Sequence, residues 1–367
     1  MERDRKNRLP WAIVLIILAF SCAIAYAGAL IYARSSAGSD FATYTTVHLE
    51  SARKVQTVSD GFIYYDGSSV TKVNERGGVR WSYVVGANAD FDACDAGIAC
   101  WVGSKLTLID AESGSPTYSG NLEGAILSAA VGREYAAALL EPEHNGTVVL
   151  MEKGGRRVDS IELSDQTVID YGFFYNDTLF WAMSLDTNGT TPSCTVNTYN
   201  PGKRIVGSIT DREQTLYRAT FQSSQISCVG DTYIRVYTYN GSEEADRRRL
   251  VYGWTLVDTD DHSDAPLMLF TLNGEYETEG AIRDVRLIRD SEEQTIRLPY
   301  GCMDVKVWND GIYGFSRAGY VMIGRMGEQK VDAYQITLTF DTVYGMTGDG
   351  TAVLGNGNDV YLLRLTK

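Results

Sequence analysis

Residues 54–84 read KVQTVSDGFIYYDGSSVTKVNERGGVRWSYV, and this stretch decides the fold. Its apolar runs and turn residues predict four short strands, at residues 54–58, 62–65, 70–73 and 79–84. Asp60-Gly61 and Asp66-Gly67 supply the positive φ that tight hairpin turns require. A lone four-stranded meander cannot bury its apolar side in water. The stretch therefore predicts a repeating unit that packs against copies of itself.

Further repeats are marked by a turn glycine that is followed four residues later by an aromatic or apolar side chain. The glycines are Gly77, Gly114, Gly154, Gly202 and Gly327, and the side chains are Trp81, Tyr118, Val158, Val206 and Val331. The first three intervals between glycines are 37, 40 and 48 residues, so the period is near 40. The last interval is 125 residues, about three periods, and predicts two repeats with degenerate turns in between.

The region with degenerate turns, residues 211–298, contains strand-like runs at 233–239, 249–257, 266–272 and 282–288. The chain ends after only three strands of a unit, at 342–346, 351–354 and 360–365. Residues 41–49 form a spare strand that completes this last unit. Four-stranded units with this period predict an all-β fold, a β-propeller of eight four-stranded blades over residues 41–367. Seven blades are the alternative, if residues 211–298 form one blade with an insertion.

An anchor precedes the propeller. Residues 10–33 carry no charge and are long enough to span the roughly 30 Å hydrocarbon core as a helix. The preceding basic residues, Arg3, Arg5, Lys6 and Arg8, predict a cytoplasmic tail at 1–9, a linker at 34–40 and an extracytoplasmic propeller. Signal-peptide cleavage near residues 25–29 and a lipid anchor on Cys22 are weaker alternatives. The apolar run exceeds the roughly 7–15 residues of a signal peptide, and Ala19-Phe20-Ser21 is a poor lipobox.

The net charge of −14 disfavours nucleic acid as a partner, and none is predicted. The first 34 residues hold five basic and two acidic side chains, so the remainder holds 28 basic and 45 acidic ones, a net charge of −17. Phosphate backbones and anionic lipids repel such a surface. Acidity of this kind is typical of a soluble, solvated surface.

Cysteine spacing leaves two disulfides open. Cys94 and Cys100 flank a predicted turn and face each other if they lie across a hairpin, and Cys194 and Cys228 are about one repeat apart. Small buried thiols are the equally favoured interpretation. Cys302 has no evident partner in either scheme.

The turns resemble those of PQQ-type, quinoprotein-like propellers, in which an Asp-x-x-x-Gly-x-x-x-Trp turn follows a strand. Residues 110–118, DAESGSPTY, match with tyrosine in place of tryptophan, and residues 74–81 match with one residue fewer. The whole layout is similar to uncharacterised membrane-anchored propeller proteins of Gram-positive bacteria. In that superfamily, quinone-bearing enzymes use two adjacent cysteines above the cofactor. This chain has no such pair, so the resemblance implies no cofactor.

Few residues favour catalysis. His48, His144 and His262 are scattered, and no spacing of histidine and cysteine predicts zinc. The acidic loop with Asp258, Asp260, Asp261 and Asp264 is a weak calcium candidate, but its spacing does not fit an EF-hand. A solvated loop is the favoured interpretation. The aromatic side chains are interpreted as packing between blades rather than as a sugar-stacking platform; they are Trp81, Trp101, Tyr118, Trp181 and Trp308.

These observations together predict a membrane-tethered binding or scaffolding module at the cell envelope, with an envelope protein or a glycan as ligand and no catalytic residues. The loops that converge on the central channel are the expected binding face. The alternative is an extracytoplasmic enzyme that acts on cell-wall carbohydrate with paired carboxylates.

Overall fold

The computed structural model of the protein describes residues 42–141, 146–163, 166–174, 178–260, 265–274 and 282–365. The predicted tail, anchor and linker, at 1–9, 10–33 and 34–40, lie outside these residues. In the part of the chain that the structure describes, no helix has the length and apolar character needed to cross a membrane. The membrane anchor therefore stays a prediction from the sequence.

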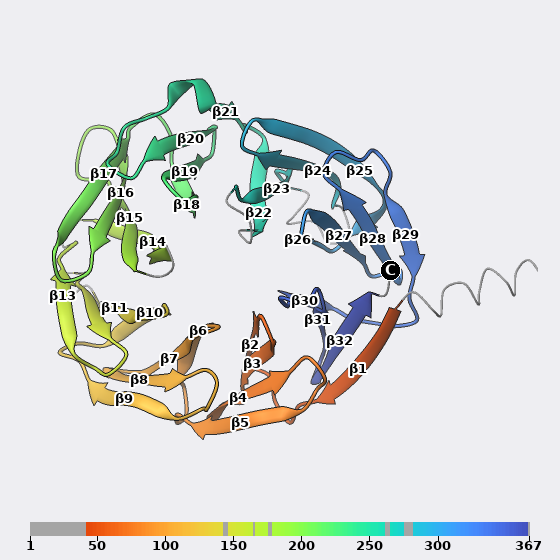
Figure 1. The fold of residues 1–367 in the computed structure, drawn as a ribbon, viewed down its shortest axis with the longest axis horizontal. Helices are drawn as coiled ribbons and strands as arrows, with labels where there is room; N and C mark the ends of the chain where they lie inside the picture. Colours follow the sequence, from red (N-terminus) through yellow and green to blue (C-terminus); the bar gives the residue numbers. More distant parts are fainter. Residues whose placement is uncertain are drawn as a thin grey trace, which may run out of the picture.

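Eight four-stranded antiparallel sheets form a closed ring, as the blades of a propeller (Figure 1). Seven of them use consecutive strands, of which the first is innermost and the fourth outermost. Blades 1 to 4 comprise β2 (Lys54–Val58), β3 (Gly61–Tyr65), β4 (Ser69–Asn74), β5 (Val79–Val84); β6 (Asp90–Cys94), β7 (Gly97–Val102), β8 (Lys105–Asp110), β9 (Pro116–Asn121); β10 (Ile126–Val131), β11 (Tyr135–Leu140), β12 (Val148–Glu152), β13 (Arg157–Ile161); and β14 (Thr167–Phe174), β15 (Leu179–Asp186), β16 (Ser193–Asn200), β17 (Arg204–Asp211).

The two blades with degenerate turns and the seventh blade follow the same plan. They comprise β18 (Leu216–Phe221), β19 (Gln225–Gly230), β20 (Tyr233–Thr238), β21 (Arg249–Leu250); β22 (Trp254–Asp260), β23 (Leu267–Leu272), β24 (Ile282–Arg289), β25 (Glu292–Cys302); and β26 (Asp304–Trp308), β27 (Gly311–Ser316), β28 (Tyr320–Arg325), β29 (Asp332–Gln335). A short 3-10 helix, η2 (Ala245–Arg247), precedes β21. Eight blades, rather than seven, are confirmed.

The eighth blade joins the two ends of the described chain. Its strands are β30 (Thr342–Met346), β31 (Ala352–Asn356), β32 (Asp359–Leu365) and, on the outside, β1 (Ala42–His48). β1 pairs with β32 along its whole length, from Ala42 opposite Leu365 to His48 opposite Asp359. The His48 Nδ1 lies 2.8 Å from Asp359 Oδ1. The predicted closure of the ring by the N-terminal strand is confirmed.

The turn glycines are where the sequence predicted them, with one exception. Gly77, Gly114, Gly202 and Gly327 have positive φ angles between 69° and 86°. In blade 3, however, Gly155 has the positive φ, at 87°, and not Gly154. The Gly155 N–H donates to the Glu152 carbonyl at 2.8 Å, so the second glycine of the pair makes the turn.

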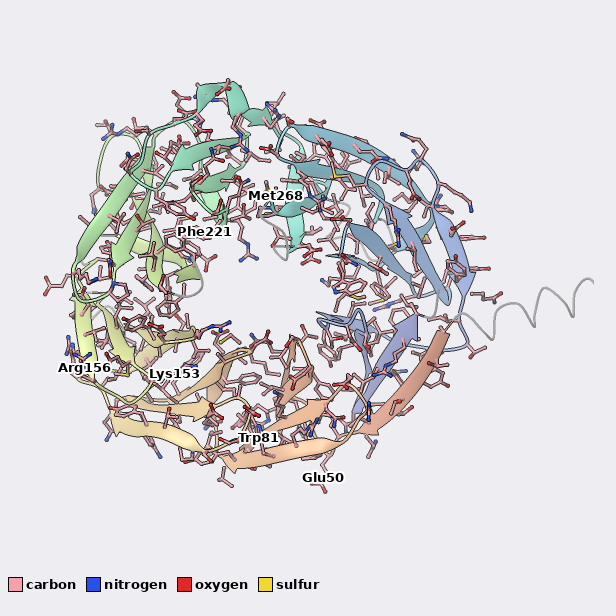
Figure 2. All side chains as sticks on the ribbon, in the orientation of Figure 1. Glu50, Trp81, Lys153, Arg156, Phe221 and Met268 are labelled. Carbon is pink, nitrogen blue, oxygen red and sulfur yellow. The ribbon has the colours of Figure 1, made fainter. Side chains whose placement is uncertain are left out.

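The aromatic side chains that follow the first two turn glycines pack on the turn of the next blade. A Cβ added to Gly114 would lie 2.5 Å from Trp81 Cγ, and one added to Gly155 would overlap the Tyr118 ring. Trp81 lies at the outer part of the ring (Figure 2), and its Nε1 donates to the Ala111 carbonyl at 3.1 Å. Only glycine allows this close approach. The predicted packing role is confirmed for Trp81 and Tyr118.

The other predicted packing aromatics also lie between blades. Trp101 and Trp181 are buried, and Trp308 fills the space where a Cβ on Gly350 would stand. Apolar side chains from adjacent blades form a separate cluster at every junction, including the closing one, where Leu49, Phe62 and Leu362 meet. The core is therefore a ring of junctions, and opening any one exposes apolar surface.

One predicted strand is wrong. Residues 249–257 do not form a single strand, because the backbone turns at Gly253, which has a φ of 86°. The Trp254 N–H donates to the Val251 carbonyl at 2.9 Å in that turn. The run is thus divided between β21, the last strand of blade 5, and β22, the first of blade 6.

Candidate binding site

The ring has two distinct faces. Every inner strand begins at one of them, which also carries the connections from outer to inner strands and the loops between second and third strands. We call it the upper face. The hairpin turns between first and second strands, and between third and fourth strands, lie at the lower face.

β-Bulges interrupt several inner strands near the upper face. The pairing register with the second strand shifts between Ile126 and Ser128 in β10, and between Val168 and Asp170 in β14. A bulge carries one extra residue and re-aims its side chain. The extra residues here are Leu127, which is 50% exposed, and Ile169, which is 36% exposed.

A cleft of about 400 Å³ lies along β10 and β14, the inner strands of blades 3 and 4. Its polar side chains are Asp92, contributed by β6, and Ser128, Asp170 and Tyr171. A second hollow, of about 460 Å³, shares Leu139 and Val168 with it and opens among upper-face loops of the same blades. Together we call the two hollows the blade 3–4 cleft. Volumes of this size are typical of ligand sites.

The Asp92 carboxylate links blade 2 to blades 1 and 3. The Val131 N–H donates to its Oδ2 at 3.0 Å, and the Gln56 Nε2 donates to its Oδ1 at 3.3 Å. Burial raises the pKa of Asp92 above its ordinary value and outweighs these bonds and the charge of Lys54. Its negative charge is therefore incompletely compensated.

Asp170 has a different set of partners. Its Oδ1 accepts from the Tyr171 N–H at 2.9 Å, and its Oδ2 lies 3.4 Å from the Arg218 guanidinium. Burial is again the main cause of its raised pKa, against the opposing charge of Arg218.

Two hydroxyls complete the cleft. The hydroxyls of Ser128 and Tyr171 are hydrogen-bonded at 2.8 Å. Burial raises the pKa of Tyr171, so its hydroxyl stays neutral at physiological pH. The Tyr171 ring packs against Phe180 with the ring centroids 6.0 Å apart. The cleft thus combines two acceptor carboxylates, two neutral hydroxyls and an apolar rim formed by Leu127 and Ile169. The polar groups are suited to binding cationic and hydrogen-bond-donating groups.

The predicted calcium residues are elsewhere. Asp258 and Asp260 lie in β22, so the interpretation of a solvated loop is wrong for these two, while Asp261 and Asp264 lie outside the described residues. The Asp258 Oδ2 accepts from the Val307 N–H at 2.8 Å, which joins blades 6 and 7. Among the described residues, no three histidine, cysteine, aspartate or glutamate side chains are grouped as metal ligands would be. Calcium binding by the whole loop stays an untested prediction.

Neither of the two cysteine bridges that the sequence left open is formed, and the alternative of buried thiols holds for Cys100, Cys194 and Cys228. Cys94 pairs with Gly97 and Cys100 with Phe91, so Cys94 and Cys100 point to opposite faces of their sheet. Alternation along a strand thus separates the two side chains of the hairpin. Cys194 and Cys228 share one apolar cluster between blades 4 and 5 as thiols. Burial raises the pKa of Cys100 to about 12.

Histidine contributes little to the described structure. His48 lies in the outer strand of the closing blade, away from the blade 3–4 cleft, and His144 and His262 are outside the described residues. Asp92, Ser128 and Asp170 were missed in the sequence. A signal was present, because these polar residues recur at intervals of 36 and 42 residues, close to the repeat period.

Comparisons with known proteins show the fold. BamB from Moraxella catarrhalis, a PQQ-like propeller, aligns with a TM-score of 0.56 at 12% identity, covering 89% of this chain and 98% of BamB. The computationally designed Ika8 protein has a TM-score of 0.60 at 11% identity, with 87% and 99% covered. The C-terminal WD40 domain of Sif2 has a TM-score of 0.56 at 11% identity, with 88% and 99% covered.

No protein-family model and no curated protein sequence matches the chain. Identities of 11–12% to solved structures show the propeller fold alone. The β-propeller fold predicted from the sequence is thereby confirmed.

Proposed function

We propose that this protein is a membrane-tethered, extracytoplasmic binding module that presents the blade 3–4 cleft to a ligand at the cell envelope. The cleft carries the proposal, because it combines a ligand-sized volume with incompletely compensated carboxylates in a closed, rigid ring. The likeness in layout to anchored propellers of Gram-positive bacteria supports the same location.

The topology supports a definite orientation. Ala42 begins β1 at the lower face, opposite Leu365, whereas the blade 3–4 cleft opens at the upper face. An anchor at residues 10–33 would be joined to Ala42 by residues 34–41, which span at most about 29 Å. In this arrangement the lower face is turned toward the membrane, and the cleft is turned away from it.

An enzyme that hydrolyses cell-wall carbohydrate is the second candidate. Two carboxylates with raised pKa values in one cleft favour it, since glycosidases keep one carboxyl protonated as an acid. Both carboxylates, however, already accept hydrogen bonds from backbone N–H groups of the inner strands. The Val131 bond holds Asp92 at the junction of blades 2 and 3, and the Arg218 ion pair holds Asp170 at the junction of blades 4 and 5. Carboxylates held in this way favour binding over turnover.

The experiment uses the full-length protein in its own membranes, with a photoreactive amino acid at Leu127 on the upper face or at Val79 on the outside of blade 1. Binding at the cleft predicts a crosslinked species from position 127 and none from position 79. Protease added outside intact cells should digest the propeller. Protection of the propeller from protease would contradict the tether, and equal crosslinking at both positions would contradict the cleft as the binding site.

The enzyme candidate is tested on the same purified protein with cell-wall glycan as substrate. Release of reducing ends by the wild type, and its loss in both Asp92→Asn and Asp170→Asn, would replace the binding function by hydrolysis. We expect no release above that of the double variant.

A further inference from the structure

The apolar rim of the blade 3–4 cleft is a property of blades 3 and 4 rather than of bulges in general. Bulges at the corresponding place in β18, β22 and β30 carry Tyr217, Val257 and Tyr344, which are all half-buried. Leu127 and Ile169 are exposed instead, and each lines one of the two hollows. Exposed aliphatic side chains at the mouth of a ligand-sized cleft offer apolar surface to a ligand.

Acidic groups lie directly below this rim. Asp92 and Asp170 face the hollow along β10 and β14, and the Arg218 guanidinium, which is 57% exposed, lies 3.4 Å from Asp170. An exposed ion pair of this length contributes little and is readily exchanged for another cation. The net charge of −17 on residues 35–367 adds a long-range attraction for basic segments.

The inner strands β10 and β14 also present backbone edges to the cleft. β10 and β14 are the first strands of their sheets, so each is paired on one side only. An extended chain entering from the upper face would lie along these two strand edges, where the N–H groups of Val131 and Tyr171 already donate to Asp92 and Asp170. Recognition of this kind uses main-chain bonds for affinity and alternate side chains for specificity.

We infer that the blade 3–4 cleft binds an extended polypeptide segment of a partner protein in which a lysine or arginine stands two residues away from an aliphatic residue, so that both side chains point to the same side. The basic side chain enters the hollow along β10 and β14, between Asp92 and Asp170. The aliphatic side chain packs on Leu127 and Ile169. This inference rests on the proposed binding function and names the chemistry of its partner.

The probe is a fluorescein-labelled octapeptide in which two leucines and two lysines alternate at every second position, with glycine or serine at the positions between them. Its binding to the full-length protein in a nonionic detergent is measured by fluorescence anisotropy at about 0.15 M salt, where exposed charges are screened beyond about 8 Å. Two control peptides replace either the lysines by glutamates or the leucines by serines. We expect both controls to bind at least about tenfold more weakly, a factor worth about 1.4 kcal/mol.

Two pairs of variants separate the cleft from the general acidity of the protein. Asp92→Asn with Asp170→Asn should weaken binding of the leucine–lysine peptide at least about tenfold. Glu112→Gln with Glu292→Gln makes the same change in net charge at exposed sites on blades 2 and 6 and should change binding less than about twofold. Leu127→Ser with Ile169→Ser should weaken the leucine–lysine peptide and leave the serine–lysine peptide unchanged, which a purely structural defect would not do.

Three outcomes would overturn the inference. Equal weakening by the two charge-matched variant pairs would show nonspecific attraction to an acidic surface. Tight binding of the glutamate peptide would reverse the assigned chemistry. A tetramer of β-1,4-linked N-acetylglucosamine that binds in place of the peptide, and loses binding in the aspartate variants, would assign a glycan to the cleft.

The failure of this inference is distinguishable from failure of the proposed function. If the peptide does not bind but position 127 still crosslinks to a protein in membranes, the binding function stands and the basic–aliphatic chemistry is wrong. If neither occurs, both are wrong.

Discussion

Tyr118 and Gly155 provide the sharpest test of how neighbouring blades are held together. Gly155 has a φ of 87°, and a Cβ there would overlap Tyr118 Cδ2 and lie 2.5 Å from Cε2 and 2.8 Å from Cγ. The change Gly155→Ala therefore imposes a left-handed backbone on an alanine and also displaces the tyrosine ring of the preceding blade. The two penalties can be separated, because only the second one needs the ring.

The expected magnitudes follow from these two penalties. A left-handed backbone costs a non-glycine residue about 1–2 kcal/mol, and forcing a packed side chain aside costs about 1–3 kcal/mol. Gly155→Ala should thus lower the free energy of unfolding by about 2–5 kcal/mol. Tyr118→Ala removes a half-buried ring and should cost about 2–3 kcal/mol, below the range for a fully buried aromatic. In the double variant the displaced ring is absent, so its destabilisation should fall short of the sum by about 1–3 kcal/mol.

The measurement is guanidinium unfolding of the propeller, residues 41–367, followed by tryptophan fluorescence and circular dichroism. A shift of the midpoint at constant slope reports the change in stability. Gly154→Ala is the matched control, because a Cβ at Gly154 meets nothing within 4 Å and its φ is not positive. Its expected effect is within about 0.5 kcal/mol. Simple additivity of Tyr118→Ala and Gly155→Ala, or an equal cost for the two glycines, would refute the reasoning.

Three further outcomes are expected. Deletion of Ala42–His48 removes the strand that covers β32, so the melting temperature should fall by at least about 10 °C relative to a chain that begins at residue 42, and an unchanged value would contradict closure by β1. Burial raises the pKa of Asp258, so the wild type loses stability as the pH rises from the unfolded-state pKa to the folded-state pKa of this group. The variant Asp258→Asn lacks this loss, so its urea midpoint minus that of the wild type should increase from about pH 3 to neutrality. A constant or falling difference would contradict the raised pKa of Asp258. Burial raises the thiol pKa values of Cys100, Cys228 and Cys302, so a maleimide dye should label them at least about 100-fold more slowly in the native protein than in denaturant, and fast native labelling would contradict their burial.

The fold was predictable from the sequence because its rules are local. A positive φ in a tight turn calls for glycine, so Gly77, Gly114 and Gly202 recorded the period of the blades. The same rule failed where two glycines were adjacent. Spacing cannot choose between Gly154 and Gly155, and the choice depends on which N–H reaches the Glu152 carbonyl.

The candidate site was not predictable in the same way. Asp92, Ser128 and Asp170 come from three different blades, and their meeting depends on how neighbouring sheets pack. The bulges that expose Leu127 and Ile169 are shifts of one residue in pairing, which a short strand pattern does not reveal. Aspartates in apolar strands were a signal, but only the ring shows that they face one cleft.

The closing strand connects the fold with the candidate site, because it decides on which face of the ring the proposed anchor is attached. The first inner strand, β2, begins at the upper face with Lys54. A propeller whose chain started there would be tethered at the upper face, beside the mouth of the blade 3–4 cleft. Because β1 is added on the outside of the last blade, the described chain starts at the lower face, opposite Leu365. The strand that closes the ring would therefore also keep the proposed tether away from the cleft. Moving the proposed anchor to the C-terminus would preserve that orientation, since Leu365 ends at the same face.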